Sequence, residues 1–62
     1  MRIERGSSVR VRGVPGCPMG VVVQDSSDRS LVEFPTREGA ERDWYQNDRL
    51  EVVHGPIHAP EP

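Results

Sequence analysis

Prolines and glycines interrupt this 62-residue chain so often that a long helix is excluded. Prolines at positions 15, 18, 35, 56 and 60 fix the backbone angle φ and lack an amide hydrogen. No window between them repeats apolar residues at the three- and four-residue spacing of an amphipathic helix. Short segments rich in β-branched side chains lie between the interruptions instead. The sequence therefore predicts an all-β fold made of short strands.

Five segments have the composition or the alternation of a strand. In residues 8–12, for example, Val9 and Val11 share one face, and Arg10 and Arg12 share the other. Polar turn residues and glycine-containing loops separate the segments, and residues 47–49 predict a single 3₁₀ turn before the last strand. The predicted strands are residues 8–12, 21–24, 30–34, 42–46 and 50–53.

Five short strands with frequent turns favour a small closed β-barrel, because closure leaves no sheet edge exposed. So short a chain buries too little apolar surface to stabilise an open two-sided sheet. We expect the barrel to span residues 1–53, and residues 54–62, with their prolines and histidines, to form a flexible tail. Either Trp44 or Tyr45 faces the core, and the other expected core residues are Val9, Val11, Val21, Val23, Val32, Phe34, Leu50 and Val52.

Four sequence elements resemble those of small SH3-like barrels. They are Arg5-Gly6-Ser7-Ser8-Val9-Arg10-Val11, Gly20-Val21-Val22-Val23, Leu31-Val32-Glu33-Phe34-Pro35 and Leu50-Glu51-Val52-Val53. The first is similar to the opening of the E-subunit family of photosystem I. The second half of the chain resembles the ferredoxin-docking small subunit of the photosynthetic NADH dehydrogenase-like complex. Bacterial Tudor-like and KOW-like modules share the second and third elements. The resemblance implies a five-stranded SH3-like barrel, and the use of arginine without lysine suggests a small bacterial protein.

Charge is distributed unevenly, although the formal net charge is only −2. Residues 1–23 contain four arginines and one glutamate, whereas residues 24–62 contain four arginines and nine acidic residues. Arg10 and Arg12 share the outer face of the first strand, which suits docking of an acidic protein such as a ferredoxin, or of a phosphate backbone. The alternative is an ordinary solvated face whose arginines meet Glu33 or Glu51 across the sheet.

Two loops, at residues 13–20 and 35–40, flank one end of the expected barrel. Whichever of Trp44 and Tyr45 lies outside the core is the natural anchor for a partner there, since exposed aromatic residues and arginines are enriched in binding hot spots. Val14 and Met19, in the first loop, either cap the barrel or extend the contact patch. The predicted partner-binding residues are Arg10, Arg12, Trp44, Tyr45, Val14 and Met19.

The sequence lacks the patterns of catalytic and metal sites. It contains no Ser/His/Asp order and no phosphate-binding glycine loop, and side chains fill the interior of so small a barrel. Cys17 has no basic neighbour in the sequence to activate its thiol, which indicates an ordinary reduced cysteine rather than a redox or cofactor site. Gly55 and Pro56 break any helix that would pair His54 with His58 as metal ligands. We therefore expect no enzyme activity, no metal and no cofactor.

These observations predict a cytoplasmic accessory module, monomeric or weakly oligomeric, that docks on a larger protein through an arginine and aromatic surface. No apolar run approaches the ~20 residues of a membrane span, and the first residues lack the apolar stretch of a secretory signal. The alternative function is a Tudor- or KOW-like module that associates with nucleic acid or the transcription machinery. An excess of acidic residues and the presence of only three aromatic residues count against that alternative.

Overall fold

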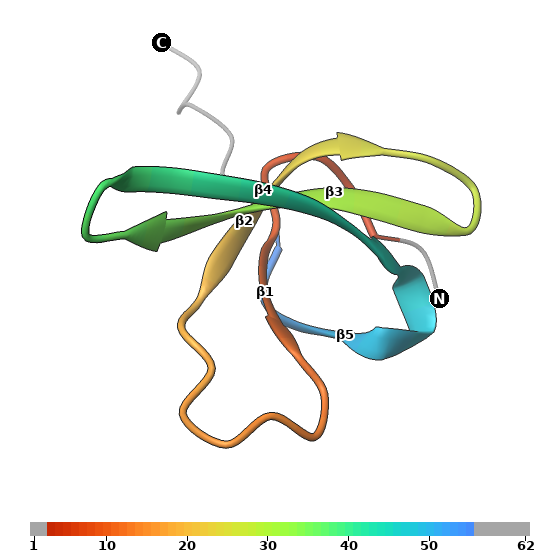
Figure 1. Ribbon diagram of the computed structural model, residues 1–62. Coiled ribbons are helices and arrows are strands. Elements are labelled where there is room, and N and C mark those ends of the chain that lie inside the picture. The colour runs from red at the N-terminus through yellow and green to blue at the C-terminus, as the bar shows by residue number, and fades with distance from the viewer. Residues whose placement is uncertain (1–2, 56–62) are drawn as a thin grey trace, which may run out of the picture.

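The computed structural model describes residues 3–55, which form five strands and one short helical turn (Figure 1). The strands are β1 (Ser8–Val11), β2 (Gly20–Asp25), β3 (Arg29–Thr36), β4 (Gly39–Gln46) and β5 (Leu50–His54), and the 3₁₀ turn η1 (Asn47–Arg49) precedes β5. Every predicted strand is present, and the predicted 3₁₀ turn is confirmed. No α-helix occurs within residues 3–55, so the prediction of an all-β fold is confirmed.

All five strands belong to one antiparallel sheet with the order β4-β3-β2-β1-β5. β3 and β4 form a hairpin whose register runs without a break over all eight residues of each strand. β2 is shared between two neighbours, because Gly20 and Val21 pair with β1 and the stretch from Val21 to Asp25 pairs with β3. Figure 1 shows the result: the sheet bends, and the β3–β4 hairpin crosses over the β1–β5 pair.

The outermost strands, β4 and β5, do not pair with each other in the part of the chain that the structure describes. The sheet is therefore bent but not closed, which differs from the closed barrel expected from the sequence. Charged side chains protect the free edge of β4, where Glu41, Arg42 and Asp43 follow one another. The Asp43 carboxylate accepts a hydrogen bond from the Trp44 amide at 2.9 Å, which occupies a donor that a further strand would need.

The hydrophobic core lies inside the bend of the sheet. Val9, Val32 and Leu50 are fully buried, as the sequence predicts. Ile3 and Val22 are also buried, although the sequence pattern does not place them in the core. Three half-buried residues pack against these five, namely Val11, Phe34 and Tyr45.

The middle valine of β2 faces the core, so the prediction that Val21 and Val23 form its inner face is wrong. Val22 lies opposite the buried Val32 of β3, whereas Val21 is 45% exposed. The register shifts between Val22 and Gln24, so a bulge at Val23 interrupts the alternation. A slip of one residue exchanges the two faces of a strand, and three consecutive valines contain no alternation that would fix the register.

Tyr45, and not Trp44, faces the interior. Tyr45 lies opposite the buried Ser30, and its ring meets Phe34 edge to face, with ring centroids 5.9 Å apart and an interplanar angle of 81°. Trp44 lies opposite Leu31 on the other face of the sheet and is 45% exposed. The sequence leaves this choice open because two adjacent aromatic residues suit either face equally.

The last strand differs from its prediction in two ways. Val52 is exposed although it lies opposite Val9, because β5 is at the edge of the sheet and no further strand covers it. The prediction of Val52 as a core residue is therefore wrong. His54 ends β5 and lies opposite Ser8, so the strand enters the segment expected to be a tail. Residues 56–62 of that segment, including His58, lie outside the described residues.

A buried polar contact fixes η1 against the start of β3. The Ser30 hydroxyl donates a hydrogen bond to Oδ1 of Asn47 at 2.6 Å, and both residues are buried. The Asn47 amide donates to the carbonyl oxygen of Asp28 at 2.9 Å. These two bonds anchor the 3₁₀ turn that carries the chain from β4, at one edge of the sheet, to β5, at the other.

Candidate functional site

An apolar groove of about 490 Å³ opens between the β1–β2 loop and the turn end of the β3–β4 hairpin. Residues from three strands and from the loop contribute its apolar lining, which consists of Val11, Val14, Pro18, Phe34, Pro35 and Tyr45. The groove therefore lies between the two loops at which the sequence predicts a contact surface. Its lining is mainly apolar and aromatic with a few polar groups, as is usual for binding sites.

The β1–β2 loop, residues 12–19, forms one wall of the groove. Gly13 and Gly16 have φ angles of 76° and 71°, a backbone conformation that other residues adopt at a cost. The Cys17 amide donates a hydrogen bond to the carbonyl oxygen of Val14 at 3.2 Å and so closes a turn that follows Gly13 and contains Gly16. This turn holds Val14 at the rim, where half of its surface stays exposed.

The Phe34–Tyr45 pair forms the floor of the groove. Its edge-to-face geometry brings the positive edge of one ring against the negative face of the other, which stabilises the pair beyond simple burial. Gly20 of β2 packs directly against Phe34, because a Cβ atom at this position would lie 2.7 Å from Phe34 Cε1. The Phe34 ring therefore occupies the space that a side chain at position 20 would fill.

Opposite charges border the groove, with Glu41 of β4 and Arg49 of η1 in its lining. Neither forms an ion pair within residues 3–55. Burial, together with the neighbouring acidic groups Asp43, Cys17 and Glu41, raises the pKa of the Tyr45 phenol. The phenol therefore keeps its proton at neutral pH and offers a hydrogen-bond donor, which no residue in the described part of the chain accepts.

Cys17 lies half-buried in the wall of the groove. Its thiol makes a weak hydrogen bond to the carbonyl oxygen of Pro18 at 3.4 Å. Over residues 3–55, no group of three or more histidines, cysteines and carboxylates is placed to hold a metal ion. The thiol adds a small, weakly polar surface to the groove lining.

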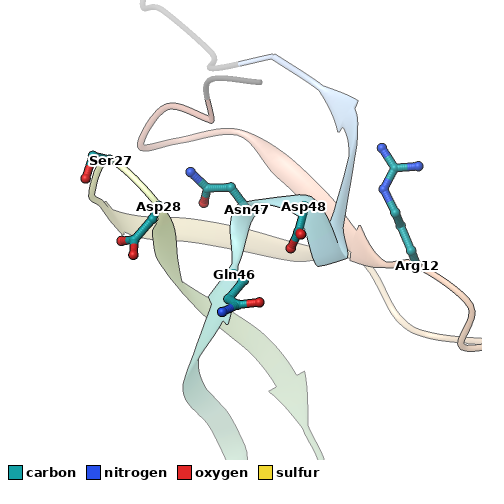
Figure 2. Close-up of a pocket in the computed structure, with 6 residues that line it drawn as sticks. All are labelled: Arg12, Ser27, Asp28, Gln46, Asn47 and Asp48. Atoms are coloured by element: carbon teal, nitrogen blue, oxygen red, sulfur yellow. The ribbon is translucent and has the colours of Figure 1, made fainter.

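A second hollow, of about 460 Å³, lies beside η1 and is lined by polar and charged residues (Figure 2); we refer to it as the polar hollow. Its lining consists of Arg12, Ser27, Asp28, Gln46, Asn47 and Asp48. Contacts within the fold hold several of these side chains: Asn47 accepts from Ser30, Asp28 pairs with Arg29 at 3.4 Å, and Nε of Arg12 donates to the Leu50 carbonyl at 3.1 Å. In Figure 2 the Arg12 side chain does not point toward Asp28 or Asp48. We therefore assign this hollow a structural role.

The two arginines predicted to bind a partner do not line the apolar groove. Arg10 lies opposite Glu51 on the neighbouring strand, whereas Glu33 pairs with Arg42 at 2.8 Å and is not available to the arginines of β1. Arg12 lies next to Arg49, because the Arg12 amide donates a hydrogen bond to the Arg49 carbonyl at 2.8 Å. Arg12 is thus close to the end of the groove, although its side chain borders the polar hollow.

The four apolar and aromatic residues predicted to bind a partner do not form one surface in the structure. Val14 and Tyr45 line the groove together. Trp44 points to the opposite face of the sheet, beside Leu31. Met19 is 47% exposed at the end of the β1–β2 loop but is not part of the groove lining.

Eight groove residues are absent from the sequence-based set: Val11, Cys17, Pro18, Phe34, Pro35, Thr36, Glu41 and Arg49. The sequence pattern assigns Phe34 entirely to the core, but the residue is only half-buried and serves both roles. The Phe34-Pro35 pair stands at the entry to the second loop, and this position is a sequence signal that could have placed Phe34 in the groove. No sequence signal marks Arg49, because its place depends on how η1 turns toward β1.

Comparison of the chain with protein-family models, with characterised proteins and with solved structures finds no match. The relation to SH3-like barrels therefore stays a prediction from the sequence. None of the described residues belongs to a helix of the length and apolar character that crossing a bilayer requires.

Proposed function

We propose that this chain is a small cytoplasmic accessory module of the SH3-like class, without catalytic activity, that binds a larger protein through the apolar groove and the arginines beside it. A bent, five-stranded antiparallel sheet with a 3₁₀ turn before the last strand supports the assignment to this class. The observation that carries the proposal of binding is the groove with the Phe34–Tyr45 floor.

The groove combines the properties of a binding site on a very small domain. Val14 at its rim and the rings of its floor supply apolar surface, and aromatic residues in such positions dominate the energetics of interfaces. The Tyr45 hydroxyl supplies a hydrogen-bond donor beside that surface. A partner side chain that enters the groove would thus lose water from apolar surface and find one directional polar contact.

Three arginines of β1, the β1–β2 loop and η1 support an acidic partner, and one of them, Arg49, lines the groove. Arg10 lies on β1, Arg12 follows β1 and bonds the Arg49 carbonyl through its amide, and Arg49 lies at the groove itself. None of the three forms an ion pair with a carboxylate among residues 3–55. A negatively charged partner would be steered toward these arginines and would bind in a fixed orientation.

Capture of partners from a native lysate tests the proposal with two matched variants. Val14→Glu places a charge at the rim of the groove, and Trp44→Glu places the same charge on the opposite face, at a residue that is similarly exposed. Quantitative mass spectrometry should show that partners retained by the wild-type chain are lost with Val14→Glu and kept with Trp44→Glu. Retention of the same partners by both variants would show that the groove is not the docking site.

The arginines without ion pairs also favour a second candidate function, which is binding to nucleic acid. The chain should then retain DNA or RNA at low salt, and this retention should fall steeply as salt rises, because bound phosphates release counterions. Under the docking proposal, the purified chain shows no such retention. An electrophoretic mobility assay over a range of salt concentrations separates the two functions.

A further inference from the structure

The edge strand β5 carries apolar side chains that the fold leaves exposed. β5 pairs with β1 on one side, and none of residues 3–55 pairs with its other side. Val52 and Val53, which are adjacent in β5, are 36% and 38% exposed. Val52 lies opposite the fully buried Val9, so it shares the inner face of the sheet but has no neighbour on the open side. An open edge of this kind is a template for a further strand.

The register between β1 and β5 determines which backbone groups point outward at this edge. In an antiparallel pair, residues that exchange hydrogen bonds alternate with residues whose N–H and C=O groups point away from the neighbouring strand. The Arg12 amide donates to the Arg49 carbonyl, so these two residues form a bonded pair. Along the unbroken register that follows, Glu51 is bonded to β1 and Val52 is not. The N–H and C=O groups of Val52 therefore point outward.

Both outward groups of Val52 are free. Neither has a hydrogen-bond partner among residues 3–55. Leu50 differs, because its amide donates to the Asn47 carbonyl and its own carbonyl accepts a bond from Nε of Arg12. Val52 thus offers a further strand one backbone donor and one backbone acceptor, next to an exposed apolar side chain.

We infer that two copies of this chain pair antiparallel through their β5 strands, about a twofold axis at Val52. In this register, the Val52 amide of each copy donates to the Val52 carbonyl of the other, which satisfies the free groups of both copies. A twofold axis perpendicular to the sheet keeps the inner faces of the two sheets on the same side. The two Val52 side chains then lie opposite each other, and each covers apolar surface that the edge exposes.

The two edges of the sheet differ in a way that selects this symmetric contact. At the β4 edge, the Trp44 amide is already bonded to the Asp43 carboxylate within a run of charged residues. A β4–β5 contact between copies, which would propagate into an open filament, is therefore disfavoured. At the β5 edge, Glu51 is the only acidic residue, and it lies opposite Arg10 of its own copy. In the symmetric register its other neighbour is Val53 of the second copy, so like charges do not meet directly.

Sedimentation equilibrium of the full chain over a range of concentrations tests the inference. The average mass should rise with concentration from the monomer value of 7.0 kDa toward twice that value. The dimer should be weak, because the edge of one short strand is a small interface. Amide hydrogen exchange of Val52 should slow over the same range, since its N–H is bonded in the dimer. A mass that stays at the monomer value up to ~1 mM chain would overturn the inference.

A matched pair of variants locates the contact. Val52→Lys should raise the dissociation constant of the dimer by at least about tenfold, because two like charges then lie opposite each other across the axis. Val21→Lys makes the same change at a similarly exposed valine of β2, which is not an edge strand, and should leave the constant unchanged. Urea titrations establish that both variants fold. Equal weakening by both variants, or by neither, would refute a contact through β5.

A mixture of Val52→Lys and Val52→Glu tests the register itself. Opposite charges face each other in the mixed dimer, so the mixture should associate more strongly than either variant alone. No gain in the mixture would refute the pairing of Val52 with its own counterpart. Protection of the Val52 amide only when another protein is added would assign the edge to that protein and would also overturn the inference. The docking function does not depend on these results, because Val52 does not line the groove.

Discussion

Gly20 begins β2 at a point where the sheet leaves no space for a side chain. A Cβ atom there would lie 2.6 Å from Cγ1 of Val32 and 2.7 Å from Cε1 of Phe34. Because Gly20→Ala forces both side chains to move, we expect the free energy of unfolding to fall by about 1–3 kcal/mol. Gly55→Ala, whose Cβ would meet nothing within 4 Å, is the matched control in urea titrations. Equal stability of the two variants would contradict this packing.

Tyr45 is the only tyrosine of the chain, so ultraviolet absorbance follows its ionisation without interference. Burial and the nearby acidic groups raise its pKa, so the titration midpoint should lie above the ordinary value of about 10. The folded state thus favours the neutral phenol. The raised pKa of Tyr45 therefore adds to the free energy of unfolding. This contribution is complete below the unfolded-state pKa and is lost as pH rises through the folded-state pKa.

Tyr45→Phe removes this ionisation and provides the control for the alkaline titration. In the wild-type chain, ionisation of the phenol contributes to the fall of the free energy of unfolding above pH ~10. Tyr45→Phe should lack this contribution, so its free energy of unfolding should fall less over the same pH range. A wild-type midpoint at or below that of free tyrosine would show that the Tyr45 ring is not packed as the structure has it.

Among the elements, η1 depends on one buried side-chain hydrogen bond, between Ser30 and Asn47. Asn47→Ala leaves the Ser30 hydroxyl without its acceptor, which should cost about 1–3 kcal/mol in the free energy of unfolding. Ser30→Ala should also destabilise the chain, but the double variant should lose less than the sum of the two single losses. Denaturant titrations of all four proteins give the coupling energy. Strictly additive losses would show that the two side chains act independently.

The accuracy of the prediction for each strand depends on how far the strand's own residues, rather than its pairing with other strands, determine its conformation. β1 alternates Val9 and Val11 with arginines, so the sequence predicts its faces, and the burial of Val9 agrees. In β2 the three valines are chemically equivalent, and only pairing with the neighbouring strands places Val22 inward. β4 begins at Gly39, before the predicted start at residue 42, because pairing with β3 extends it over residues of low β-propensity.

At the scale of the whole molecule, the sequence predicts where the groove lies but not all of the residues that form it. The two loops rich in proline and glycine mark its position, and Val14 and Tyr45 both line it. The bend of β2 decides which side chains meet, and it results from a register shift that no local pattern encodes. The same long-range pairing leaves β4 and β5 apart, so counting five strands does not predict closure.

Chemical-shift mapping of the ¹⁵N-labelled full chain, on addition of a partner captured from the lysate, tests the central claim most directly. The groove account predicts that the amide signals of Val11, Val14, Phe34 and Tyr45 shift or broaden, while those of Leu31 and Trp44 on the opposite face stay in place. Changes confined to the opposite face, with the groove signals unmoved, would contradict it.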